Sequence, residues 1–337
     1  MRKLKVVALM DEALVPPDDV KGLSPEEIEP WRTEYDVVTA LKGMGHDVLK
    51  IGLRDELTPL RLAVKNWQPD IAFNLLEEFQ GETTYDYLVV SYLESMGVPY
   101  TGCNPRGLIL SRDKGISKKL LAYHRIRTPD FAVFPRKKRV RRPRKLAYPL
   151  IVKSLVEEAS LGISQASIVE SDEKLVERVE FIHESIKTDA IVEHYIAGRE
   201  LYVGVIGNQR LEVLPTWEML FANMPADSAP IATRRVKWSR KYQKKHSIDT
   251  AAAKDLPEGA ATRISALSRR IYRILGLSGY ARLDYRMSEE GEIYLLEANP
   301  NPQLARGEDL ADSAEAAGVS YEELLQKILT TGFRARK

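Results

Sequence analysis

Hydrophobic runs alternate with helical patterns along the first third of the chain. Lys5–Met10, His46–Ile51 and Asp70–Leu75 are short, largely apolar runs of the kind that forms buried strands. Between the first two, Ser24 is followed by a proline and two glutamates, which is typical of a helix start. Strands that alternate with helices predict a parallel, Rossmann-like sheet over residues 1–105. No G-x-G-x-x-G motif follows the first strand, so no dinucleotide site is predicted there.

The pattern becomes less regular in the rest of the chain. Ser111–Ile126 predicts a lysine-rich helix that begins at Ser111, and Tyr148–Lys153 and Ala190–Tyr195 predict strands. Thr216–Tyr242 contains prolines and many cations but no regular period, so it is predicted to be an irregular, mobile loop. A chain of 337 residues is too long for one compact core, and two or three domains are expected.

Gly279–Ala305 contains two apolar strands joined by an acidic turn. Because side chains alternate along a strand, Arg282 and Asp284 share one face, and Glu297 and Asn299 share a face of the second strand. A hairpin brings these faces together, and hard oxygen ligands of this kind suit Mg²⁺ held with phosphates. The alternative is a surface hairpin with solvated charges. That alternative explains the glutamates of the turn but not Glu297, which ends an apolar run.

Composition and charge indicate the class of protein and its compartment, but they say little about its chemistry. Hydrophobic residues make up 44% of the chain and charged residues 29%, as in ordinary globular proteins. A net charge of +2 gives no reason to expect nucleic acid or a membrane as a partner. The single cysteine, Cys103, excludes an intramolecular disulfide, and no apolar stretch is long enough to cross a membrane, so a cytoplasmic protein is predicted.

A dense basic run, Arg136–Lys145, stands apart from the other motifs. It is interpreted as a solvated loop. Contact with an anion or a nucleic acid is the alternative, but no aromatic residues are interleaved for stacking on bases.

The motif Arg282-Leu283-Asp284, followed by Leu296-Glu297-Ala298-Asn299-Pro300, resembles two strands of the ATP-grasp superfamily. Within it, the chain resembles the D-alanine–D-alanine ligase branch over roughly residues 70–330. The resemblance implies an α/β fold with α+β elements in three domains. These are an N-terminal Rossmann-like domain (1–105), a central ATP-grasp subdomain (106–195) and a C-terminal subdomain with a metal site (196–337), the last two enclosing ATP.

The same resemblance implies a set of ATP contacts. Lys114 and Lys153 are similar to the two phosphate lysines of the family, and Ser160 lies in Glu158–Gly162, which is similar to its phosphate loop. The family pattern further assigns the adenine to Glu193 and the backbone near Ile196, and the ribose hydroxyls to Glu200.

The metal and catalytic positions follow from the resemblance in the same way. Asp284 would bind one Mg²⁺, Glu297 would bridge two, and Asn299 would hold the second, with Mn²⁺ as a substitute. Arg282 would lie beside the acyl phosphate. The lysine–aromatic pair of the mobile loop matches either Lys237-Trp238 or Lys241-Tyr242, and Lys237 is preferred.

The implied activity is an ATP-dependent ligation of a carboxylate to an amine through an acyl phosphate. The substrates would be small carboxylates and amines, with amino acids expected, and a homodimer is compatible with the pattern. The departures from the family lie where its amino acids bind. Met10–Pro17 replaces its glycine-rich first loop, Glu77–Thr84 replaces H-G-x-x-G-E-D-G, and Ala159 and Gln303 replace a serine and a glycine.

The motifs for ATP therefore match the family pattern, whereas the segments that bind its amino acids differ from it. The main hypothesis is a carboxylate–amine ligase with an altered amino-acid site. D-Alanine–D-alanine ligase proper, a small-molecule kinase of the same superfamily and a non-catalytic nucleotide-binding protein are the alternatives.

Overall fold

The N-terminal part of the chain forms a three-stranded parallel sheet. The computed structural model describes residues 2–157, 160–225 and 228–334. The strands lie in the order β2-β1-β3, with β1 (Lys5–Asp11) fully buried over its apolar residues. Strand β1 pairs in parallel with β2 (Asp47–Leu53) on one side and with β3 (Ile71–Asn74) on the other. The predicted parallel sheet is thus confirmed.

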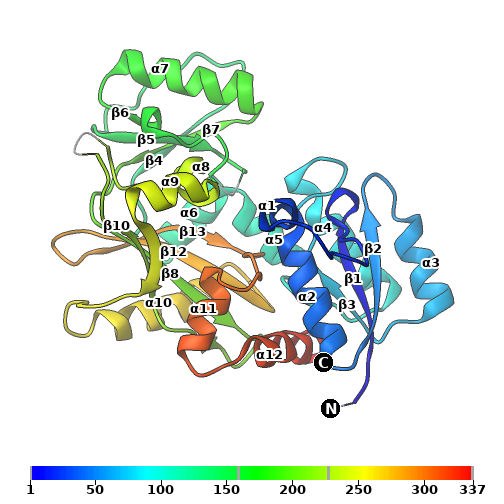
Figure 1. Cartoon of the computed structure of the whole chain (residues 1–337). Helices are drawn as coiled ribbons and strands as arrows, with labels where there is room; N and C mark the ends of the chain where they lie inside the picture. The colour runs from blue at the N-terminus through cyan, green and yellow to red at the C-terminus, as the bar shows by residue number, and fades with distance from the viewer. Residues whose placement is uncertain (1, 158–159, 226–227, 335–337) are drawn as a thin grey trace.

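Helices surround this sheet (Figure 1). Ser24 caps the first through a capping box with Glu27, as its sequence predicts. The helices are α1 (Pro25–Ile28), α2 (Arg32–Gly43), α3 (Thr58–Trp67), α4 (Asp86–Met96) and α5 (Pro105–Arg112).

The middle of the chain forms a second, antiparallel sheet in the order β4-β7-β5-β6. Its strands are β4 (Phe131–Phe134), β5 (Leu150–Ser154), β6 (Ile168–Val169) and β7 (Ala190–His194). Helix α7 (Asp172–Phe181), capped by Ser171, covers it at the top of Figure 1. A separate hydrophobic core fills the space between helix and sheet and includes Leu175 and Val192.

The basic run of residues 136–145 lies in the connection between β4 and β5. The backbone amide of Arg136 donates to the Asp189 carboxylate at 2.8 Å, and the Arg142 side chain donates to the Asp172 carboxylate at 2.8 Å. The other cations in this run are all exposed, as expected of a solvated loop.

The C-terminal part forms the largest sheet, in the order β11-β10-β8-β12-β13, with the short β9 beside β8. Its strands are β8 (Arg199–Ile206), β9 (Glu212–Val213), β10 (Trp217–Phe221), β11 (Ile248–Ala252), β12 (Tyr280–Met287) and β13 (Ile293–Asn299). Helices α8 (Arg234–Trp238), α9 (Arg240–His246), α10 (Ala260–Ile274), α11 (Asp309–Ala316) and α12 (Tyr321–Arg334) complete the chain.

The first and last parts of the chain share their hydrophobic cores. One core joins Val7 and Leu9 of β1 with Leu201 and Leu283 of the large sheet. A second core joins the opposite face of β1 with residues of α11 and α12 such as Leu324. Helix α12 packs against α2 and β3 at the base of the molecule (Figure 1). Within the described residues, no helix combines the length and apolar character needed to span a membrane.

Two predicted elements differ in the structure. The helix expected to begin at Ser111 is two helices, α5 and α6 (Lys114–Tyr123). Ser111 lies inside α5, and Asp113 separates the helices because its backbone is extended and its side chain caps α6 through the amide of Ile116 at 2.8 Å. The segment 216–242 is not irregular throughout, since it contains β10 and α8 and the start of α9.

Candidate active site

Three neighbouring strands bring the predicted metal residues and Glu200 onto one surface. On β12, alternation places Arg282, Asp284 and Arg286 on the same face. In the register with β13, Asp284 lies opposite Glu297 and Arg282 opposite Asn299, and the register shifts just after Asp284. In the register with β8, Arg286 lies opposite Glu200. The predicted hairpin is present, and its charged face forms the floor of a cleft.

This cleft is lined by residues of both antiparallel sheets. Its empty volume, which includes the part open to solvent, is about 760 Å³. It is lined by all the predicted site residues except Arg282 and Asn299, namely Lys114, Lys153, Ser160, Glu193, Ile196, Glu200, Lys237, Asp284 and Glu297. Residues that are 183 positions apart in the sequence thus meet at one site, as Lys114 and Glu297 show.

Arg282 and Asn299 lie beside the cleft in local contacts. The Arg282 guanidinium donates to both carboxylate oxygens of Asp284, at 2.8 and 2.9 Å, and lies 3.4 Å from Asp309. The Asn299 side-chain oxygen accepts from the backbone of Asn301 at 2.8 Å.

Two lysines share one buried carboxylate in the wall of the cleft. Lys153 Nζ lies 3.0 Å from Glu193 Oε2, and Lys118 Nζ lies 3.2 Å from Oε1. Burial alone would raise the pKa of Glu193, but the two ammonium groups outweigh it and lower the pKa. The pKa of Lys118 is lowered because burial exceeds the attraction of Glu193. Lys118 was not assigned from the sequence, although its place one helical turn after Lys114 on α6 was an available signal.

The carboxylates of the hairpin differ in their surroundings. Lys114 Nζ lies 3.4 Å from Glu297 Oε2 and donates to the Glu157 carbonyl at 2.6 Å. Burial would raise the pKa of Glu297, but Lys114, Lys237 and Lys153 outweigh it and lower the pKa to about 2. For Asp284, burial prevails over the adjacent Arg282 and the pKa is raised.

The donors available to a metal ion are few but of the right kind. Among the described residues, no three His, Cys, Asp or Glu side chains form a metal-binding group. The hairpin offers two carboxylates, Asp284 and Glu297, and the amide of Asn299. Mg²⁺ is usually bound by one or two carboxylates together with substrate phosphates and water, so this donor set fits it.

Glu200 is held by two donors. Tyr202 Oη donates to its Oε1 at 2.8 Å, and Arg286 Nη2 donates to its Oε2 at 2.8 Å. Both partners are buried. Arg286 was not assigned from the sequence, because its partner is 86 residues away.

The segment that follows β10 closes over the phosphate-loop candidate. Ser160 has a left-handed backbone (φ 60°), and its hydroxyl donates to the Ala232 carbonyl at 2.6 Å. Gln165 exchanges two hydrogen bonds of 3.0 Å with the backbone of Ala229. Glu158 and Ala159 of this predicted loop lie outside the described residues.

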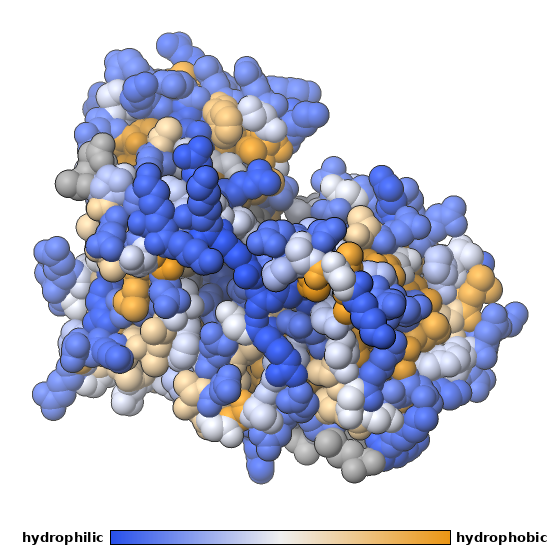
Figure 2. Space-filling view, viewed as in Figure 1, coloured by the Kyte–Doolittle hydropathy of each residue, from blue (hydrophilic) through white to orange (hydrophobic). Residues whose placement is uncertain are grey.

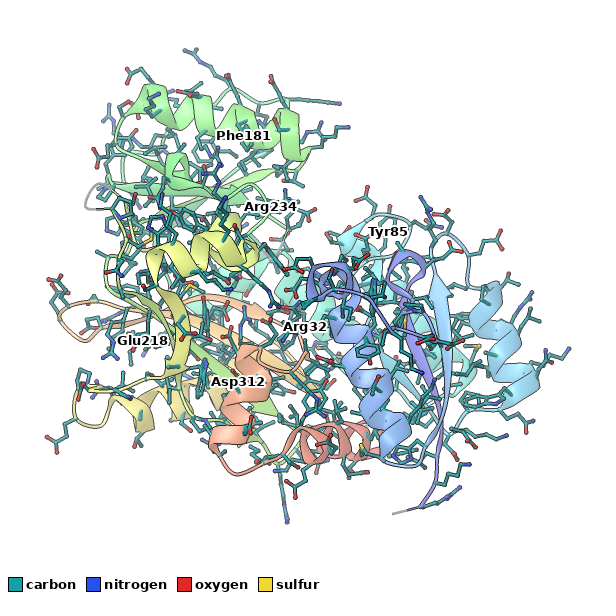
Figure 3. All side chains as sticks on the ribbon, viewed as in Figure 1. Arg32, Tyr85, Phe181, Glu218, Arg234 and Asp312 are labelled. Atoms are coloured by element: carbon teal, nitrogen blue, oxygen red, sulfur yellow. The ribbon has the colours of Figure 1, made fainter. Side chains whose placement is uncertain are left out.

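Helices α8 and α9 cross between the α7 lobe and the larger body, and Arg234, labelled in Figure 3, marks the first turn of α8. Hydrophilic side chains gather over these two helices in Figure 2. Lys237 of α8 lines the cleft, whereas Lys241 of α9 is absent from the described residues that line it.

A second cavity of about 840 Å³, which also includes space open to solvent, adjoins the first. The two share Glu157 and Leu161. Its wall includes Glu77 and Thr83, which belong to the segment that departs from the family pattern.

Comparisons with known proteins agree with this geometry. The family described as D-ala D-ala ligase C-terminus matches residues 114–330. An uncharacterised protein, y4sG, of Sinorhizobium fredii is 33% identical over 92% of this chain and 91% of its own length. The D-alanine–D-alanine ligase of Bacillus anthracis is 29% identical over 94% of this chain and 96% of its own length. The D-alanine–D-alanine ligase of Nitratidesulfovibrio vulgaris is 31% identical over 90% of this chain and 96% of its own length.

Solved structures show the same relationship. The crystal structure of the Bacillus anthracis D-alanine–D-alanine ligase with ATP has a TM-score of 0.75 and 25% identity, and covers 98% of both chains. The VanG D-Ala:D-Ser ligase of Enterococcus faecalis has a TM-score of 0.69 and 20% identity, covering 97% of this chain and 99% of its own, and shows the fold alone.

Two antiparallel sheets around a cleft of lysines and carboxylates, together with these matches, define an ATP-grasp enzyme. Because the family match covers more than half of the chain and full-length relatives support it, the chain belongs to the D-alanine–D-alanine ligase family. The family and fold class expected from the motifs are confirmed.

Proposed function

We propose that this protein is an ATP-dependent ligase that joins a carboxylate to an amine through an acyl phosphate. The observation that carries the proposal is the convergence of Lys114, Lys153 and Lys237 with Asp284 and Glu297 at one cleft. A carboxylate oxygen of the first substrate attacks the γ-phosphorus of ATP, and ADP leaves. The amine of the second substrate then attacks the acyl carbon, loses a proton and expels phosphate.

Cationic side chains offset the charge of both steps. Lys114 and Lys153 lie where phosphate oxygens would bind, and Ser160 would present its loop backbone to them. Arg282 would stabilise the oxyanion of the tetrahedral intermediate, which requires its guanidinium to share its donors between Asp284 and the substrate. Lys237, on the segment that closes the cleft, would add charge and exclude water.

The nucleoside would occupy the end of the cleft near β7 and β8. We assign the adenine to Glu193 and the backbone near Ile196, and the ribose to Glu200. Glu193 would also hold Lys153 in place, since the two form an ion pair.

Asp284, Glu297 and Asn299 would hold Mg²⁺, for which their oxygen donors are suited, and Mn²⁺ would fit the same set. When bound, these ions neutralise negative charge on the transferring phosphoryl group. The three side chains would together hold two ions.

The substrates are proposed to be amino acids. Relatives named D-alanine–D-alanine ligase match over nearly the whole chain, which favours D-alanine–D-alanine ligase itself as a second candidate. The altered segment Glu77–Thr84 contributes to the wall of the second cavity and favours a different acceptor. ATP use and a lone buried Cys103 suit a cytoplasmic enzyme, and a homodimer stays a prediction.

A substrate screen tests the proposal. The full-length protein is incubated with ATP, Mg²⁺ and pairs of D- and L-amino acids, while ADP and phosphate are measured and products are identified by mass spectrometry. We expect phosphate release that depends on an amine and a product with a new amide bond. A phosphorylated hydroxyl product would instead identify a kinase. Absence of ATP binding by calorimetry would exclude both.

A further inference from the structure

Arg286 connects three segments of the cleft wall through its guanidinium. Only 3% of the residue is exposed. Nη1 donates to the Gly198 carbonyl at 2.7 Å, and Nη2 donates to Glu200 at 2.8 Å and to the Pro230 carbonyl at 2.6 Å. Its charge also lies 5.9 Å from the centre of the Tyr195 ring. Arg286 therefore fixes the link between β7 and β8, the start of β8 and the segment that closes the cleft.

These contacts determine which acceptor positions of Glu200 stay available. Each carboxylate oxygen can accept about two hydrogen bonds. Tyr202 occupies one position on Oε1 and Arg286 occupies one position on Oε2. Among the residues that the structure describes, no other side chain takes the remaining position on each oxygen, and Glu200 lines the cleft. Two adjacent acceptors with a fixed orientation match the two O–H donors of a vicinal diol.

We infer that Arg286 is a positioning residue that orients Glu200 to accept both hydroxyl groups of a ribose, and so sets the preference for ribonucleotides. The inference rests on the proposed function, because it takes the nucleotide to bind in this cleft. Arg286 does not touch the reacting phosphate in this assignment; it acts through Glu200. The guanidinium is planar and has several donors, so lysine would keep the charge but not all three bonds.

The same sheet contains a matched pair that serves as a control. Arg199 binds both oxygens of Glu218, at 2.7 and 2.5 Å, and also donates to two carbonyl groups. Neither Arg199 nor Glu218 is among the described residues that line the cleft. Arg199→Met therefore removes a comparable arginine–glutamate pair, and strand alternation places the Arg199 side chain on the opposite face of β8 from Glu200.

The test compares the dissociation constants of ATP, 2′-deoxyATP and 3′-deoxyATP, each with Mg²⁺, by titration calorimetry on the full chain. Loss of one hydrogen bond to a charged acceptor weakens binding by about tenfold or more, which is the preference expected of the wild-type protein. In Arg286→Met we expect weaker ATP binding and a preference reduced to about twofold or less, because Glu200 is no longer fixed. Arg286→Lys should give an intermediate preference, and Arg199→Met the wild-type preference.

The ratio of two dissociation constants does not depend on the fraction of folded protein. A wild-type ratio in Arg286→Met would overturn the inference. If that variant does not fold, a wild-type ratio in Arg286→Lys would overturn it. ATP binding without any hydroxyl preference in the wild-type protein would overturn the inference alone. No ATP binding at all would overturn the proposed function with it.

Discussion

At the residue scale, the alternating charges of β12 order the site from one end to the other. Arg286 pairs with Glu200, Asp284 faces Glu297, and Arg282 reaches Asp309. Residues two apart on a strand are separated by roughly 6.5–7 Å. The proposed ribose, metal and acyl-phosphate positions therefore follow one another along a single strand, in the direction in which an extended nucleotide triphosphate would lie.

Glu297 offers the most direct test of the metal assignment. In Glu297→Gln we expect kcat to fall by at least about 100-fold, because a neutral amide cannot hold two cations in place of a carboxylate. The pKa of about 2 means that the native side chain is ionised at any working pH, so the substitution removes a real charge. Steady-state kinetics with the substrates from the screen gives kcat, and circular dichroism checks the fold.

Glu290→Gln, in the exposed turn of the same hairpin, is the control and should keep kcat within about twofold. A Glu297→Gln variant with native turnover would remove Glu297 from the metal site.

The sequence could predict residues whose signal is local. Asp284, Glu297 and Asn299 follow from strand alternation within one hairpin. Lys118 had one local signal, its helical spacing from Lys114, and Arg286 had none, since their partner carboxylates, Glu193 and Glu200, lie on distant strands. A lysine or arginine in isolation reads as a solvated side chain until its partner is known.

At the element scale, α8 and α9 decide which lysine reaches the cleft. The sequence allowed either Lys237 or Lys241 as the lysine of the closing segment. The two helices are separated at Ser239, whose side chain caps α9 through the amide of Tyr242. Of these two lysines, only Lys237 is among the described residues that line the cleft.

We therefore predict that Lys237→Met lowers kcat by about 100-fold, while Lys241→Met changes it by less than about threefold. The reason is that Lys237 is near enough to the hairpin to lower the pKa of Glu297. Both variants remove one charge from the same surface, so general electrostatic effects cancel in the comparison. Equal losses in the two variants, measured as kcat at saturating ATP, would contradict the assignment.

Elements whose limits depend on long-range pairing were the least predictable. Strand β10 is fixed by β8 on one side and β11 on the other, which no local pattern reveals. In contrast, the cap of α12 depends on four consecutive residues, because Ser320 and Glu323 bond each other's backbone amides.

At the scale of the whole molecule, one lobe differs from the rest because it does not share its hydrophobic core. The β4–β7 lobe has its own core, whereas the first and last parts of the chain have common ones. Leu108 of α5 and Leu121 of α6 belong to a common core. The proposed boundary at residues 105 and 106 thus places two helices in a lobe whose core they do not join.

Hydrogen exchange can test this organisation. Leu175→Ala, in the core of the β4–β7 lobe, should destabilise that lobe by about 2–5 kcal/mol and raise exchange mainly within residues 131–194. Leu325→Ala, in a common core, should raise exchange in both β1–β3 and the C-terminal sheet. The same pattern of exchange in both variants would show that the chain opens as one unit.

The common cores also have a consequence for the order of events during synthesis. Strands β1 to β3 are complete at Asn74, but Leu324, which helps helix α2 to cover one face of them, is made about 250 residues later. At roughly 5–20 residues per second, the ribosome needs about 12–50 s to supply it. For that interval part of the apolar surface of the first sheet lacks its partners from α12. The β4–β7 lobe has its own core and can fold during this interval. Although it is synthesised after the first sheet, it can therefore complete its folding earlier.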